Sequence, residues 1–113
     1  MAIPSGAGTE VLKRTTTDGL GNSDVKVIDG EADHIYTVLS IIFFVHTAAT
    51  IEIKVNPSAG TAIYLVSQAG LANNSTFVFN DKFCLTGTDE LVFSLGDSGN
   101  VDVLVSYIEN RWA

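Results

Sequence analysis

The 113-residue chain has few of the residue types on which common chemistries depend: one cysteine, two histidines, one tryptophan and 6 basic residues against 13 acidic ones. The single cysteine, Cys84, excludes an internal disulfide. Cys84 lies in the apolar run Phe83-Cys84-Leu85, so we expect a buried and unreactive thiol. Only Pro4 and Pro57 interrupt the chain, and ten glycines supply turns.

Basic charge and long hydrophobic runs are also scarce. The formal net charge is −7, and no basic stripe interrupts it, so a phosphate backbone would repel the protein and we expect no nucleic-acid partner. The longest apolar run, Ile41 to Val45, is far below the roughly 20 residues of a membrane span, so we expect no membrane partner. The first residues lack the basic region and apolar core of a secretory signal, which favours folding in a cytosol.

Catalytic motifs are missing as well. The sequence has no Gly-x-Ser-x-Gly elbow, no glycine-rich phosphate loop before a helix and no local cysteine–histidine signature. A glycosidase would need two facing carboxylates, and nothing singles out two of the 13 acids. We therefore predict a binding or structural module with no catalytic residues and no cofactor.

The residues that bind metals give no recognisable site. His34 and His46 are 12 residues apart, which places them on one face of a straight strand but roughly 40 Å from each other. They cannot share a metal within one chain, although a threefold axis would bring one histidine from each subunit together. The simpler expectation is that each bonds to backbone or water. Five acids between residues 18 and 33 fit no EF-hand spacing and are expected to be solvated. Asp97 and Asp102 are expected to cap the turn between them.

What the sequence does contain is a dense apolar stretch from His34 to Thr47, made almost entirely of β-branched, aromatic and hydroxyl residues. This composition favours a long central β-strand over a buried helix. Strict alternation would place Ile41, Phe43 and Val45 on one face and Ile42, Phe44 and His46 on the other. Both faces would be largely apolar, which is typical of a strand buried in a sandwich or against another subunit.

Short strand patterns follow one another along the rest of the chain, separated by turn residues every 8 to 12 positions. No segment has a helical period, and no internal repeat is present. The pattern predicts an all-β protein: a single-domain antiparallel β-sandwich, jelly-roll-like, with about eight or nine short strands. Residues 1–9 form a flexible N-terminal arm, and residues 10–113 form the sandwich domain. The expected strands are 10–17, 25–28, 34–47, 50–55, 61–67, 76–80, 82–85, 90–95 and 101–108.

Aromatic residues are numerous for a small sandwich: six phenylalanines, three tyrosines and Trp112. One possibility is that other subunits cover part of this set. The alternative is a normally filled core with Trp112 folded back over it.

Three segments resemble small virion structural proteins of tailed bacteriophages, marine phages especially. They are the opening Met-Ala-Ile-Pro-Ser-Gly-Ala-Gly-Thr-Glu-Val-Leu-Lys-Arg, the middle His-Ile-Tyr-Thr-Val-Leu-Ser-Ile from residue 34, and the close Ser-Gly-Asn-Val-Asp-Val-Leu-Val-Ser-Tyr-Ile from residue 98. Within that class a capsid decoration (cement) protein fits best, one that binds the capsid surface as an oligomer and stabilises it. The resemblance implies the major capsid protein and further copies of the chain as partners, as a homotrimer, and a virion location after synthesis in the host bacterial cytoplasm.

The resemblance implies no catalytic, cofactor or metal residues. Candidate partner contacts lie in the arm, which could lie along the capsid or add a strand to a neighbouring sheet edge, and in the C-terminal tail. They are Ala2, Ile3, Pro4, Tyr107, Arg111 and Trp112. A tail, fibre or knob-like module that contacts a host surface glycan is the alternative, which exposed aromatics beside carboxylates would favour.

Overall fold

The computed structural model describes residues 9–58, 60–96 and 98–111, and every regular element in that part of the chain is a β-strand. Within it, no helix has the length and apolar character needed to cross a membrane. The nine strands are β1 (Thr9–Leu20), β2 (Val25–Asp29), β3 (His34–Thr47), β4 (Ala49–Asn56), β5 (Ile63–Leu71), β6 (Ser75–Phe79), β7 (Phe83–Thr86), β8 (Glu90–Leu95) and β9 (Asn100–Arg111).

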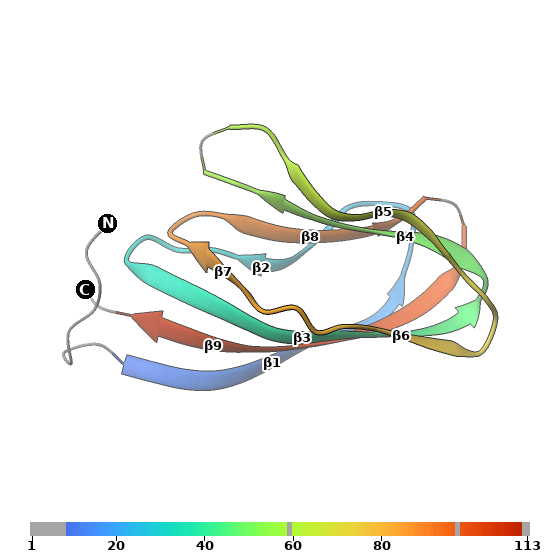
Figure 1. Cartoon of the computed structure of the whole chain (residues 1–113), viewed down its shortest axis with the longest axis horizontal. Coiled ribbons are helices and arrows are strands. Elements are labelled where there is room, and N and C mark those ends of the chain that lie inside the picture. Colours follow the sequence, from blue (N-terminus) through green and yellow to red (C-terminus); the bar gives the residue numbers. More distant parts are fainter. Residues whose placement is uncertain (1–8, 59, 97, 112–113) are drawn as a thin grey trace.

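The strands form two antiparallel sheets that face each other (Figure 1). The five-stranded sheet has the order β1-β9-β3-β6, with β7 pairing with β3 beyond the end of β6, and the four-stranded sheet has the order β2-β8-β4-β5. Successive strands alternate between the sheets from β1 to β4, and β8 and β9 return to lie between early strands. This is jelly-roll topology with one strand split into β6 and β7. The predicted fold class is confirmed.

The core lies between the sheets and is built from the inward residues of both. Phe43 on β3 and Phe93 on β8 are fully buried, and their ring centroids lie 5.3 Å apart. Phe77 of β6 packs against Phe43 at 6.0 Å. Because these rings come from three strands in two sheets, their burial holds the two layers together.

Strand β3 does not follow the strict alternation that its sequence predicts. Tyr36 and Val38 are buried in its first half, whereas Ile41 and Phe43 are buried in its second half. The pairing with β9 shifts between Val38 and Ser40, which marks a β-bulge. The extra residue turns the following side chains to the opposite face. The expectation of one alternation along the whole strand is therefore wrong. Even-numbered residues face the core before the bulge, and odd-numbered residues face it after the bulge.

The same bulge places the two histidines on opposite faces of the sheet. His34 faces the interior and is buried, whereas His46 is exposed on the outer face. The expectation that an even spacing places them on one face is wrong, because an inserted residue changes the parity along the strand.

Two local expectations also fail. The segment after residue 17 was expected to be a turn, but β1 continues to Leu20, which is buried. A register shift between Thr17 and Leu20, with Gly19 at a φ of +74°, allows the strand to bend there. Cys84 was expected to be buried, but it is exposed, because Leu85 points inward and its neighbour on a strand must point outward.

Candidate interaction face

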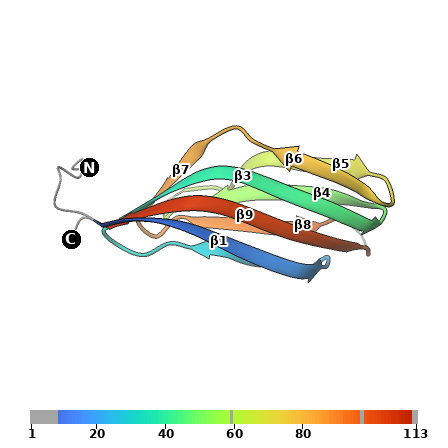
Figure 2. The ribbon, with the colours of Figure 1, turned by 90° about the horizontal axis from the view of Figure 1, so that it is seen from below.

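The outer face of the five-stranded sheet carries an apolar row that runs across four strands. Ile42 of β3 pairs with Leu104 of β9 on one side and with Val78 of β6 on the other, and Leu104 pairs with Thr16 of β1. Residues paired across strands share a face. Ile42 is 37% exposed and Val78 is 50% exposed. We call Thr16, Leu104, Ile42 and Val78 the central row; Figure 2 looks onto the sheet that carries it.

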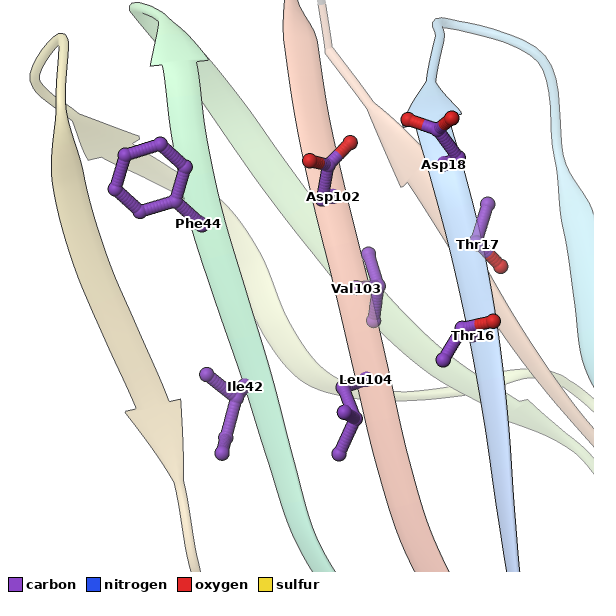
Figure 3. Close-up of a pocket in the computed structure, with 8 residues that line it drawn as sticks. All are labelled: Thr16, Thr17, Asp18, Ile42, Phe44, Asp102, Val103 and Leu104. Carbon is purple, nitrogen blue, oxygen red and sulfur yellow. The ribbon is translucent and has the colours of Figure 1, made fainter.

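A groove of about 310 Å³ contains three of the four side chains of the central row: Thr16, Leu104 and Ile42. It is open to solvent, and Phe44 of β3, 37% exposed, forms part of its wall. Figure 3 shows that its residues come from three adjacent strands, with Ile42 and Phe44 on β3 opposite Thr16 and Asp18 on β1. The full lining is Thr16, Thr17, Asp18, Ile42, Phe44, Asp102, Val103 and Leu104. The groove therefore combines an apolar floor with carboxylates at one end.

Asp102 organises the acidic end of this groove. One carboxylate oxygen accepts a hydrogen bond from His46 Nε2 at 2.7 Å, and the other accepts one from the Gly19 N–H at 3.1 Å. The hydrogen bond from His46, and then that from Gly19, hold the pKa of Asp102 below its usual value of 3.8. The ring of His46 also meets Phe44 edge-on at 4.8 Å. Asp102, on β9, therefore links the end of β1 to β3. The sequence predicted a different role, in which Asp102 caps the turn that precedes it.

The outer face of the four-stranded sheet is different in kind. Lys26 forms an ion pair with Glu90 at 2.9 Å, and Lys54 forms one with Asp24 at 2.9 Å. These long side chains cover Val92, which points outward on β8 and is nevertheless only 2% exposed. Ion pairs cover the centre of this face, and its exposed apolar side chain, Tyr64 at 53%, lies on the edge strand β5. On the five-stranded sheet the apolar side chains run across the central strands without such a cover.

His34 lies at the far end of the sandwich and is held by the chain itself. Its Nδ1 donates to the Ala32 carbonyl at 2.8 Å, and its Nε2 lies 3.4 Å from a carboxylate oxygen of Glu109. The ring stacks on Tyr36 with a centroid distance of 5.9 Å. The expected bond to backbone is present for His34, whose ring closes this end of the core, whereas the expectation is wrong for His46, which bonds to the Asp102 carboxylate.

The predicted contact residues are only partly within the described chain. Two of them are described: Tyr107 is half-buried and packs against Tyr36 at 6.2 Å between the sheets, and Arg111 is exposed at the end of β9. The others lie outside the described residues: Ala2, Ile3, Pro4 and Trp112. Their role as contacts stays a prediction.

The groove and the central row were missed by sequence reasoning. Phe44, Ile42 and Leu104 are each unremarkable in sequence, and only the register of β3 and β9 brings them together. One signal was available: both faces of residues 34–47 are apolar in sequence. This pattern indicates that both faces are buried in some contact, but it does not show which face packs on the second sheet and which one is left at the surface. Over the ranges that the structure describes, no three histidine, cysteine or acidic side chains gather as metal ligands do.

A scan against protein-family models finds no match, and no curated protein matches the sequence. Solved structures do share the fold. A pilus protein of Bacillus endospore appendages has a TM-score of 0.60 at 14% identity, over 100% of this chain and 97% of that one. The capsid of a Helicobacter pylori bacteriophage gives a TM-score of 0.54 at 10% identity, over 94% of each chain. The tobacco streak virus coat protein gives 0.50 at 14% identity, over 94% of this chain and 87% of that one.

These likenesses cover 94–100% of this chain and 87–97% of the neighbouring chains. Pilus and capsid proteins from bacteria and viruses are among the neighbours. At such low identity the likeness establishes the fold and no more, because one fold serves many functions.

Proposed function

We propose that this protein is a structural component of a bacteriophage virion and, more specifically, a capsid decoration (cement) protein that binds the outer capsid surface as an oligomer. The observation that carries the proposal is the uncovered apolar face of the five-stranded sheet. Contiguous apolar groups on the surface of a small protein mark a site of association. On the other sheet, ion pairs cover the centre, and the exposed apolar side chains Ile63 and Tyr64 lie on the edge strand β5.

The fold and the charge agree with this role. A phage capsid chain and a viral coat protein share the jelly-roll unit over nearly their full length, and the resemblance of the opening, middle and closing segments is to phage virion proteins. A net charge of −7 keeps a surface protein soluble and gives it no attraction for packaged DNA. The proposed partners are the major capsid protein and further copies of the chain; the homotrimer implied by the resemblance stays a prediction.

One observation favours the alternative of a tail, fibre or knob-like module that contacts a host glycan. Phe44 is exposed beside the carboxylates of Asp102 and Asp18. An aromatic ring offers an apolar platform to a sugar ring, and carboxylates accept hydrogen bonds from its hydroxyls.

Immunogold electron microscopy of phage particles tests the proposal and separates the two locations. An antibody against the purified protein should label the capsid shell at many positions in every particle. Label confined to the tail or its fibres would replace the decoration role with the alternative. Particles that carry no label, while the same antibody detects the protein in the infected-cell lysate, would overturn a virion role altogether.

A further inference from the structure

Two charged side chains flank the central row on strand β1. Along β1, Arg14 stands two residues before Thr16 and Asp18 stands two residues after it. Both side chains are exposed, and each lies about 7 Å from the row at the usual rise of a strand. A positive and a negative charge thus flank the apolar row on one strand of the same face.

Neither charge forms an ion pair with an opposite charge in the part of the chain that the structure describes. Lys13, the neighbour of Arg14, pairs with Glu109 at 3.0 Å, but Arg14 has no ion pair with any other described residue. Asp18 lies beside the carboxylate of Asp102, and the nearby His46 ring bonds to Asp102. Two carboxylates side by side at the end of a groove attract a cation, and the chain itself does not bring a lysine or arginine there in its described part.

We propose that this face packs against the same face of a second copy of the chain, about a two-fold axis that runs along the central row. A rotation about that axis places Leu104 and Ile42 opposite their own copies. It also places Arg14 of each chain opposite Asp18 of the other. Such an isologous contact is self-complementary. This contact rests on the proposed function and names the surface through which the oligomer forms, which makes that oligomer a dimer in place of the homotrimer that the resemblance implies.

The size of the face suits a dimer of moderate stability. Four strands about 4.8 Å apart are roughly 19 Å wide, and five side-chain rows about 7 Å apart extend roughly 30 Å, which gives about 600 Å² for each copy. A total of about 1,200 Å² is at the lower end of specific, stable interfaces. Two copies of net charge −7 repel each other in general. The contact with two Arg14–Asp18 pairs is therefore favoured over orientations that lack them.

The charge pairs allow a test by complementation. In copies that all carry Arg14→Asp, both pairs become acid against acid, and in copies that all carry Asp18→Arg, both become base against base. We expect each variant alone to have the mass of one chain, 12.0 kDa, by light scattering after size exclusion. In an equimolar mixture both pairs are again opposite in charge, so we expect about 24 kDa, as for the wild type. A mixture that stays monomeric at concentrations where the wild type is dimeric would overturn the proposal.

A matched pair of apolar substitutions tests the centre of the face without changing the charge pairs. Ile42→Asp adds a charge on the proposed axis, whereas Ile63→Asp adds the same charge on β5 of the other sheet, where Ile63 is 56% exposed. We expect Ile42→Asp to raise the dimer dissociation constant at least a hundredfold and Ile63→Asp to leave it within about threefold. Circular dichroism of both variants confirms that they fold. Equal dissociation constants would count against this face.

The mass of the wild type decides the remaining alternatives. A monomer at every concentration, or a trimer of about 36 kDa, would overturn the two-fold contact. A monomer that binds capsids through this face, and loses binding in Ile42→Asp, would assign the face to the capsid protein and leave the proposed function standing. A dimer that does not bind capsids would support the two-fold contact and overturn the proposed function.

Discussion

Two adjacent phenylalanines offer a direct test of how β3 sits in the sandwich. Phe43 is fully buried between Phe77 and Phe93, whereas Phe44 is 37% exposed at the groove. The two residues have the same side chain and are neighbours on the same strand. Each one is thus the control for the other, and any difference between their alanine variants reports on burial.

The expected losses differ severalfold. Phe43→Ala removes a fully buried ring and leaves a cavity, which costs about 3–5 kcal/mol of unfolding free energy. Phe44→Ala removes a ring that already contacts water on one side and leaves no closed cavity. Its expected cost is about 1 kcal/mol, from partial apolar burial and the edge-on contact with His46.

Urea unfolding at dilute concentration, where self-association does not contribute, measures both values. With a slope near 2 kcal/mol per molar urea, Phe43→Ala should lower the midpoint by about 2 M and Phe44→Ala by about 0.5 M. Phe43→Leu, with an expected loss of about 1.5 kcal/mol, remains measurable where the alanine variant does not fold. Equal losses at the two positions, or a larger loss at Phe44, would refute the assignment of faces after the bulge.

Three further predictions concern local features. Leu20→Ala should cost about 2–4 kcal/mol, because this side chain is 1% exposed; a thermal melt that does not move would show that β1 ends earlier. The hydrogen bonds to Asp102 lower its pKa, so its contribution to stability is present above its unfolded pKa and is lost as the pH falls through its lower, folded pKa. Urea midpoints from pH 7 to pH 2 should fall less for Asp102→Asn than for the wild type, and parallel curves would contradict this. Cys84 should react with about one equivalent of a thiol reagent in the native protein. Reaction only after unfolding would place it in the core.

Much of the fold was predictable because strand patterns and turn residues are local properties. The bounds 34–47 for β3 and 90–95 for β8 agree with the structure, and the ranges predicted for most other strands differ from it by a few residues. Period-2 patterning and turns every 8 to 12 residues restricted the architecture to an antiparallel sandwich or barrel, and eight or nine strands favoured a jelly roll.

The remaining features of the fold and of the candidate site depend on how the strands pair, which cannot be read from the sequence. The bulge near Leu39 changes the face of every later residue of β3, and no residue type there signals it. The bond between His46 and Asp102 joins positions 56 residues apart. A sequence pattern that is apolar on both faces cannot tell which face the second sheet covers. The candidate site was for these reasons found only in the structure.

Capsid binding follows directly from the decoration role and can be measured by sedimentation. Purified protein is mixed at increasing concentrations with expanded empty capsids of the bacteriophage proposed to carry it, and the bound amount is measured after sedimentation. We expect saturable binding with a fixed number of copies per capsid. We also expect Ile63→Asp, on the other sheet, to bind as the wild type does. A folded protein that stays in the supernatant at every concentration would contradict the decoration role.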